Sequence, residues 1–511
     1  MLDRKFVFYF IFGILFIISI AERSLFSMQS DTSMQISVLE NTLNGMVLGV
    51  DVREVSTPMA IAIFLPGIFI GKYLGTTSET GVYTTCYLVF LLSLYLFYKF
   101  DRKAKLLNNI EQFFFYLSYI FIFIVYFQDV FAQREHFALM LMMPYLAQQA
   151  CSLSKITNIS IPEKIVTGMM MGIACAIKPY FLIVLICFSI HDFYRIKHLK
   201  VLFGIDKISI YIVYVIYSLW CYYVYPEYFV FMKDYLLKYY VIDYFDLYAM
   251  VRQPHSVAYF YLLILTLFIN YKLASQKKIA LFKILFFSSL CFYAIYFIQR
   301  RGYPYHLYPS FVLLFLAFIL TCNTSLMTMR DRGVKRTDIQ LFCIGAVFFL
   351  LFCLTEGFSS FRVTQSTDAF GKTISRLVSS PTMLSLNRDL GEGHPLVRDI
   401  KGKWVGSYPS IWGYVNVLQE DLPLIKRDTF DDLPPKIRDR YTLMREASVE
   451  QLITTAKDIR ERKPDIILLS KNHYWREFVL SQKDIQDALK DYEPAAEIGV
   501  TEIWKRKILV R

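Results

Sequence analysis

Hydrophobic residues recur up to about Glu356 in runs of roughly 15 to 20 residues, separated by short polar segments. A run of this length is what an α-helix needs to cross a hydrocarbon layer of about 30 Å. After residue 360 the long runs stop and charged residues become frequent. The pattern predicts a polytopic α-helical membrane protein that ends in a water-exposed domain.

The hydrophobic runs predict about eleven transmembrane helices. They cover residues 6–22, 82–98, 113–127, 137–152, 164–177, 179–192, 208–226, 256–271, 280–298, 309–323 and 338–355. Loops rich in Lys and Arg lie on the cytoplasmic side of membrane proteins, and this rule is satisfied when the N-terminus is cytoplasmic. The odd number of spans then places the C-terminal domain on the non-cytoplasmic side.

The apolar stretch Pro58 to Tyr73 is long enough to be considered a further span. Counting it would move four cations outside and invert every later loop, against the positive-inside rule. These cations are Lys99, Arg102, Lys103 and Lys105. We therefore interpret it as an interfacial or re-entrant helix within an outer loop that covers residues 23–81.

Two domains are expected: residues 1–358 form the membrane domain with its outer loop, and residues 359–511 form a soluble α/β domain. In the second domain, Ser448 to Arg462 reads as an amphipathic helix that begins at Ser448 as N-cap. Strands are expected at Asp465 to Ser470 and at Ala495 to Lys505, the latter with Gly499 inside it. This order predicts a small α/β fold.

Composition agrees with this interpretation. The chain is 55% hydrophobic and 19% charged, whereas soluble domains carry about 25% charged residues. The formal net charge of +12 is compatible with nucleic-acid binding, but the cations lie in short loops between apolar runs, so no nucleic-acid partner is expected. The nine cysteines lie in or beside apolar runs, which implies neither a disulfide framework nor a metal site. No cofactor is expected, and no motif indicates a divalent cation.

Two acidic clusters are candidates for chemistry. Asp31 lies about ten residues beyond the first span, and Asp51 and Glu54 follow in the same outer loop. The second cluster is Gln133-Arg134-Glu135-His136, at the boundary between two spans. Solvated loop acids and interfacial anchoring are the plain alternatives, but ionisable groups at membrane depth are costly and are functional candidates by default.

Two cationic clusters fall on the same predicted side. Lys178 precedes Pro179 at the tip of a tight helical hairpin, where the alternative role is snorkelling to the interface. The fourth cluster is an outward loop that contains Arg300, Arg301, Tyr305 and His306. Positive-inside bias does not explain cations on this side, and Arg guanidinium groups bind phosphate through paired hydrogen bonds.

Carboxylates and cations on one face suit sugar transfer from a lipid phosphate. A carboxylate deprotonates the acceptor hydroxyl, and the cations stabilise the departing phosphate. The expected catalytic residues are Asp31 and Glu135. The residues expected to bind substrate are Asp51, Glu54, Arg134, His136, Lys178, Arg300, Arg301, Tyr305 and His306.

At these residues the sequence resembles the bacterial class C (GT-C) glycosyltransferases related to protein mannosyltransferases and aminoarabinose transferases. Gly45 to Met59 is similar to a first-loop pattern of these relatives, with Asp51, Glu54 and Pro58 in place. Three further motifs match: Gln133 to His136 with Pro144-Tyr145, the pair Lys178-Pro179, and Arg301 to Pro309, in which Arg301 replaces a Lys.

The resemblance spans roughly residues 20–310 and implies a GT-C membrane fold, a polyprenyl-phosphate-sugar donor and a catalytic first-loop acid, which falls on Asp31. The expected activity is a membrane glycosyltransferase that moves a sugar to an envelope glycan, lipid or protein on the non-cytoplasmic face of a bacterial inner membrane. Two alternatives stay open: a transporter or flippase of a lipid-linked or anionic solute, and an envelope polysaccharide polymerase or ligase. A transporter places its charges near the bilayer midplane and often has internal repeats.

Overall fold

The computed structural model describes residues 4–154, 158–235, 245–272, 280–331, 368–411, 424 and 432–507. The chain divides into two compact units. We call the first the helical unit (Met1–Leu25, Pro66–Leu219 and Phe245–Thr364) and the second the α/β unit (Phe26–Leu65, Trp220–Tyr244 and Gln365–Arg511). Each unit is described by itself. The expected domain boundary at residues 358 and 359 lies outside the described residues.

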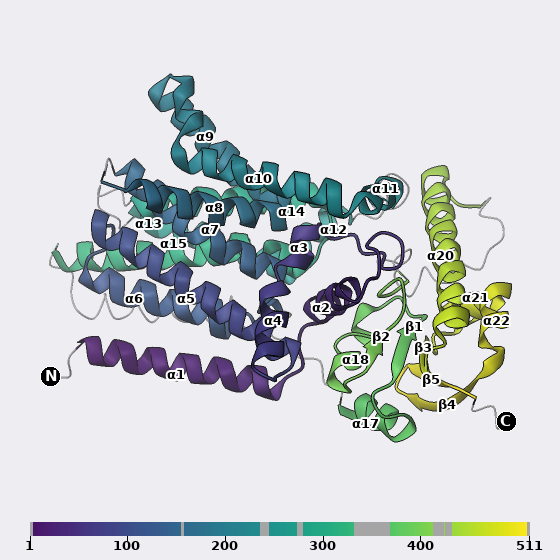
Figure 1. Cartoon of the computed structure of the whole chain (residues 1–511). Helices are drawn as coiled ribbons and strands as arrows, with labels where there is room; N and C mark the ends of the chain where they lie inside the picture. The colour runs from purple at the N-terminus through teal and green to yellow at the C-terminus, as the bar shows by residue number, and fades with distance from the viewer. Residues whose placement is uncertain are drawn as a thin grey trace. The chain divides into compact units, whose positions relative to one another are not determined.

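Long helices make up the helical unit (Figure 1). They are α1 (Arg4–Leu25), α5 (Ser78–Ala104), α6 (Asn109–Ile120), α7 (Arg134–Leu153), α8 (Ile161–Ile177), α9 (Leu182–Ile196), α10 (Ile205–Val224), α13 (Pro254–Lys272), α14 (Ala280–Gln299) and α15 (Pro304–Asp331). The shorter helices are α4 (Leu65–Tyr73) and α12 (Leu247–Arg252). These ten long helices coincide with the first ten predicted spans, and the eleventh (338–355) lies outside the described residues.

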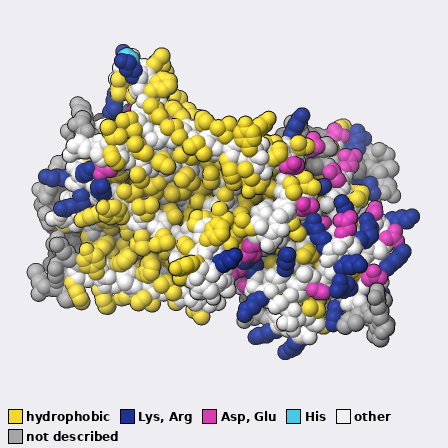
Figure 2. Space-filling view, viewed as in Figure 1, with side chains coloured by type: hydrophobic (Ala, Val, Ile, Leu, Met, Phe, Trp, Pro, Cys, Tyr) yellow, Lys and Arg dark blue, Asp and Glu magenta, His cyan; other side chains and the backbone are white. Residues whose placement is uncertain are grey.

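The helical unit has the surface of a membrane protein. Among the described residues, seven helices are long and apolar enough to cross a bilayer. Large apolar side chains such as Phe10, Ile17, Tyr95, Ile212 and Phe268 are exposed on the helices of this unit, and hydrophobic side chains dominate this surface in Figure 2. Helix α7 is different, because residues 134–151 are all buried where α5, α8, α14 and α15 pack around it. The prediction of a polytopic α-helical membrane protein is confirmed.

The apolar stretch Pro58 to Tyr73 is broken into two short helices. Helix α3 (Pro58–Ala62) has 5 residues and α4 has 9. At 1.5 Å per residue, α4 reaches about 14 Å, roughly half of the hydrocarbon thickness. Neither helix alone is long enough to span a membrane. Glycines allow α4 to pack closely on α5, since a Cβ on Gly81 would lie 1.9 Å from the carbonyl oxygen of Gly67.

A five-stranded sheet with the order β2-β1-β3-β5-β4 organises the α/β unit. The strands are β1 (Thr382–Ser385), β2 (Lys403–Trp404), β3 (Ile466–Ser470), β4 (Tyr492–Ile498) and β5 (Thr501–Arg506). Strand β1 pairs in parallel with β2 and β3, whereas β5 is antiparallel to β3 and β4. Residues Ile466 to Leu469 of β3 are all buried, so both faces of the sheet are covered there.

Helices around the sheet are α17 (Asp368–Leu377), α18 (Leu396–Asp399), α20 (Pro435–Arg462), α21 (His473–Ser481) and α22 (Lys483–Ala488). The predicted N-cap at Ser448 is wrong, because α20 begins at Pro435 and Ser448 is a buried residue inside it. The predicted single closing strand is also wrong. Gly499 has a φ of +54° and lies in the turn of a β4–β5 hairpin, a conformation that glycine adopts without strain.

The α/β unit also contains most of the first outer segment. Residues Phe26–Leu65 fold as α2 (Ser30–Leu43), a turn and α3, and α11 (Pro226–Tyr235) belongs to the same unit. The stretch that was predicted as an outer loop is therefore largely ordered as helices, and a substantial part of it packs with the C-terminal region.

Candidate active site

A buried ion pair in the helical unit joins two of the predicted clusters. Glu135 lies in the first turn of α7, where a negative charge is favourable beside the helix N-terminus. Lys178 follows the last residue of α8, and Pro179 directs it into an extended conformation (φ −134°, ψ 100°). The Lys178 Nζ lies 2.6 Å from Oε1 of Glu135, whose side chain has no solvent exposure.

Further basic groups surround this pair. Arg134 and His306 both interact electrostatically with Glu135, and Arg301 interacts with His306. The side chains of Arg134 and Arg301 are buried. The guanidinium groups of Arg134 and Arg301 and the ammonium group of Lys178 are thus gathered in the region around Glu135. The cluster suits an anionic ligand such as a phosphate group.

Two buried polar atoms at the cluster are without a hydrogen-bond partner among the described residues: Oε2 of Glu135 and Nδ1 of His306. Buried polar atoms in native proteins are nearly always bonded to protein or water. These two atoms are accordingly available to a ligand or to water. Tyr305 lies beside them, with its ring stacked on Tyr303 at 5.4 Å and edge-on to His306 at 4.7 Å.

Arg300 contributes to the turn that presents Arg301. Its Nε donates to the carbonyl oxygen of Phe245 at 3.1 Å, and the Phe245 N–H donates to the Arg300 carbonyl at 2.7 Å. Arg300 and Gly302 both have positive φ angles, +52° and +68°. This geometry gives Arg300 a structural role, and its predicted part in substrate binding stays a prediction.

His136 faces a different environment from Glu135. Its Nδ1 accepts a hydrogen bond from the N–H of Ala132 at 3.0 Å, and its ring packs against Phe123, Phe131 and Tyr308. The side chain is almost fully buried. Its Nε2 is buried and has no hydrogen-bond partner among the described residues, and its role in substrate binding stays a prediction.

The acidic residues of the first outer segment belong to the α/β unit. Asp31 is half-buried in the first turn of α2, where Gln29 caps the helix by accepting from the N–H of Thr32. Asp51 is half-buried, and its Oδ2 accepts from the N–H of Val47 at 2.9 Å. Asp51 therefore stabilises its own turn, and Asp31 places a negative charge at the N-terminus of α2, where such a charge is favourable.

Glu54 lies in a buried polar cluster beside α2. Its Oε1 accepts from Gln35 Nε2 at 3.1 Å and from the N–H of Ser56 at 2.9 Å. Four buried atoms have no hydrogen-bond partner among the described residues: Thr32 Oγ1, Ser33 Oγ, Gln35 Oε1 and Glu54 Oε2. Three of these four residues lie on α2, the helix that carries Asp31.

Sequence reasoning missed helix α2, and with it Gln35, because the outer segment was taken as a loop. A signal for the helix was present, since Ser30-Asp31-Thr32 combines an acid and hydroxyl residues of the kind that begin helices. Within the described ranges, no group of three His, Cys, Asp or Glu side chains is arranged to hold a metal ion.

A bundle of long apolar helices followed by a small α/β domain is the architecture of the GT-C class of membrane glycosyltransferases, and the chain has this fold. It is similar to the crystal structure of ArnT from Cupriavidus metallidurans bound to undecaprenyl phosphate. The alignment covers 97% of both chains at 10% sequence identity, with a TM-score of 0.50. The apo structure of the same ArnT aligns over 97% of both chains at 10% identity, with a TM-score of 0.49. No protein-family model matches the chain, and no curated protein matches it by sequence.

Proposed function

We propose that the protein is a membrane glycosyltransferase that moves a sugar from a polyprenyl-phosphate donor to an envelope glycan, lipid or protein. The observation that carries this proposal is the buried cluster of Arg134, Lys178, Arg301 and His306 around Glu135. The GT-C fold supports it, as does the undecaprenyl phosphate bound to the ArnT neighbour. The sugar and the acceptor are left open.

In the proposed reaction, Asp31 takes the proton of the acceptor hydroxyl. The acceptor oxygen forms a bond to the anomeric carbon while the bond from that carbon to the phosphate oxygen breaks, and the configuration inverts. The phosphate leaves with the bonding electrons, and its charge is stabilised by Lys178, Arg301 and the other basic groups. Glu135 fixes the Lys178 ammonium, and Asp51 and Glu54 are assigned to substrate binding.

The test is release of sugar from its carrier. Purified protein is incubated with labelled polyprenyl-phosphate sugars in detergent, and labelled acceptor and free lipid phosphate are quantified. We expect Asp31→Asn to abolish transfer while its yield and thermal unfolding match the wild type. The matched control is Asp484→Asn, an exposed acid of the α/β unit that pairs with Arg460 at 3.8 Å. Full turnover by Asp31→Asn removes this residue from the mechanism.

The same assay separates the alternatives. A flippase or transporter moves the lipid-linked sugar without breaking its bond to phosphate, so intact donor is recovered. A polymerase or ligase breaks the bond and differs in the size of the labelled acceptor.

The proposal includes an orientation in a bacterial inner membrane. The N-terminus is cytoplasmic and the C-terminal domain is on the non-cytoplasmic side, as the loop charges favour. Protease added to intact spheroplasts should then digest the C-terminal domain. Protection in intact spheroplasts, with digestion after lysis, reverses the orientation.

A further inference from the structure

The segment that carries Asp31 is held by the C-terminal region of the chain through two groups of polar contacts. Both groups lie within the α/β unit, which combines Phe26–Leu65 with Gln365–Arg511. One group holds the C-terminal half of α2, and the other holds the turn that follows it. We call the two groups together the clamp.

The first group centres on Arg398. Its guanidinium binds the Glu40 carboxylate through two hydrogen bonds, of 2.7 and 3.0 Å, and it also donates to Ser37 Oγ at 3.3 Å. Asn41, one helical turn after Ser37, donates from Nδ2 to the carbonyl oxygen of Trp404 at 3.1 Å. Paired charge-assisted hydrogen bonds fix orientation as well as distance. These contacts therefore fix the position of the C-terminal half of α2 and its rotation about the helix axis.

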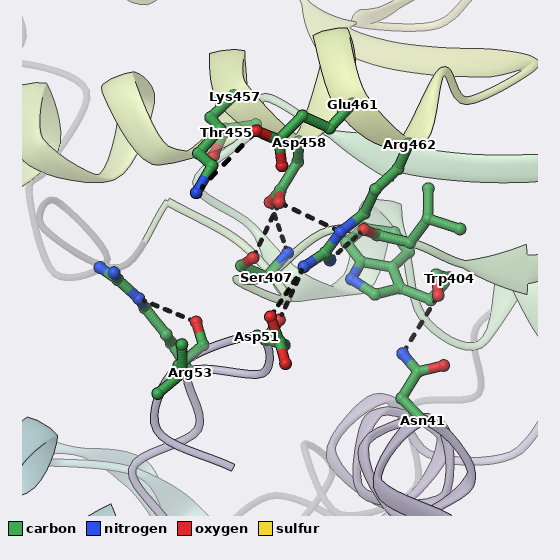
Figure 3. A network of polar contacts seen from close by, with 12 residues as sticks. Asn41, Asp51, Arg53, Trp404, Ser407, Thr455, Lys457, Asp458, Glu461 and Arg462 are labelled. Atoms are coloured by element: carbon green, nitrogen blue, oxygen red, sulfur yellow. Dashed lines mark hydrogen bonds and ion pairs between the residues drawn. The ribbon is translucent and has the colours of Figure 1, made fainter. Parts of the chain in front are cut away.

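The second group centres on Arg462 and holds the turn at residues 47–53 (Figure 3). Arg462 donates to the carbonyl oxygens of Val405 and Asp51, at 2.6 and 3.3 Å. Its orientation is set by Asp458, which lies 3.4 Å from Arg462 Nε.

Arg53 adds a third connection in the same region. Its N–H donates to the carbonyl oxygen of Ser407 at 2.8 Å, and its guanidinium donates to the Tyr408 hydroxyl at 2.8 Å. Asp458 also accepts from the N–H and hydroxyl of Ser407, at 2.7 and 2.9 Å. The residues that hold the turn are thus bonded to one another.

Helix α2 depends on such contacts. It has 14 residues, and isolated helices of this length are marginal in water. Its sequence is largely polar, and residues 32–39 are all buried, so the rest of the unit supplies the interactions that order it. Asp31 lies in its first turn, and a shift of α2 therefore moves the carboxylate.

We propose that the C-terminal domain positions the Asp31 helix and that Arg398 and Arg462 are positioning residues for sugar transfer. This inference rests on the proposed function. In this role the C-terminal domain affects the rate of the chemical step, because it holds α2 in place. It is not assigned to capture of the acceptor. A misplacement of a catalytic group by about 1 Å can reduce the rate about a hundredfold.

The test uses the full-length protein and two readouts. Hydrogen exchange of the amides in Ser30–Leu43 reports the clamp whether or not a sugar is transferred. Steady-state kinetics with a polyprenyl-phosphate sugar report its effect on turnover. The variants are Arg398→Gln, Arg462→Gln and the charge swap Arg398→Glu with Glu40→Arg. The control is Arg476→Gln, which breaks a 2.7 Å contact with Glu502 elsewhere in the same domain.

We expect Arg398→Gln and Arg462→Gln to speed exchange in α2 and to lower kcat about tenfold or more, with little change in the donor KM. The charge swap should recover part of both losses, and Arg476→Gln should behave as the wild type. Unchanged α2 exchange or unchanged kcat in both single variants overturns the inference, as does an equal effect of Arg476→Gln.

The two readouts distinguish failure of the proposed function from failure of the positioning role. If the wild type transfers no sugar from any donor while Arg398→Gln still speeds exchange in α2, the proposed activity is wrong and the clamp alone is supported. If the wild type is active and the clamp variants are unaffected, the activity stands and the positioning role is wrong.

Discussion

The Lys178 ammonium lies 2.6 Å from a Glu135 carboxylate that is completely shielded from solvent. Two features of the sequence produce this pair: the acid follows the first residue of α7, and Lys178 precedes the proline that ends α8. The desolvation cost of such a pair is large, and attraction between its members offsets it only while both remain charged. The pair is thus sensitive to the removal of either member.

Lys178→Met should destabilise the protein more than the double change Glu135→Gln with Lys178→Met. The single change leaves the buried carboxylate without its nearest cation, at a cost of about 3–5 kcal/mol. The double change removes the buried anion as well. Thermal unfolding of the three proteins in one detergent measures the difference, and equal losses in the single and double variants would contradict the prediction.

Arg301→Gln should raise the KM for a polyprenyl-phosphate sugar about tenfold and change kcat less. A charge-assisted hydrogen bond contributes about 1.5–3 kcal/mol, which is enough for this effect. The KM of Arg301→Lys should lie between those of the wild type and Arg301→Gln, because Lys keeps the charge and loses the paired hydrogen-bond geometry. Arg252→Gln is the control, because this exposed Arg stacks on Tyr248 at 5.2 Å. An unchanged KM in Arg301→Gln excludes this residue from donor binding.

Gly81→Ala should lower the yield and thermal stability of the folded protein. A Cβ there would lie 1.9 Å from the Gly67 carbonyl oxygen, so α4 and α5 would have to separate. Overpacking of this kind costs about 1–3 kcal/mol or more. Gly13→Ala is the matched control, since its Cβ meets no atom within 4 Å. The measurement is the monodisperse fraction and the melting temperature in detergent, and similar values for both variants would refute the close approach.

Glu392→Gln should weaken the pH dependence of stability. Burial, together with the neighbouring charge of Asp389, raises the pKa of Glu392 to about 7, against about 4.3 in an unfolded chain. The folded state binds more protons between these values, so this stability is full below about pH 4 and is lost as the pH rises through 7.

The drop in melting temperature between pH 5 and pH 8 should therefore be smaller in Glu392→Gln than in the wild type, by about 2–4 °C. Glu493→Gln, an exposed acid on β4, serves as the control and should retain the wild-type dependence. A drop of equal size in Glu392→Gln and the wild type would show that Glu392 does not titrate in this range.

The membrane helices could be predicted from the sequence because each span carries its own signal. A run of apolar residues is a local property, and each of the first ten predicted spans overlaps a described long helix, with ends that differ by up to eight residues. The loop charges were also sufficient to set Pro58 to Tyr73 apart from the spans, and the structure breaks this stretch into two short helices.

Elements that depend on distant partners could not be predicted in this way. Helix α2 is polar, and what orders it is contact with residues such as Arg398 that lie far away in the sequence. The start of α20 was misplaced because its first half, from Pro435, lacks an apolar period, so Ser448 was taken for the cap. For the candidate site, residue types located Glu135 and Lys178 separately, whereas only the fold brings them into contact.

The clamp joins segments of the chain that are synthesised at different times. A ribosome delivers about 5–20 residues per second from the N-terminus, so α2 is synthesised well before Arg398, Trp404 and Arg462. During this interval the spans insert while α2 is without the partners that hold it. If the clamp positions α2, Asp31 takes its final position only after the C-terminal domain has folded. Under the proposed function and this positioning role, a chain that is inserted in the bilayer before its C-terminal domain has folded transfers no sugar.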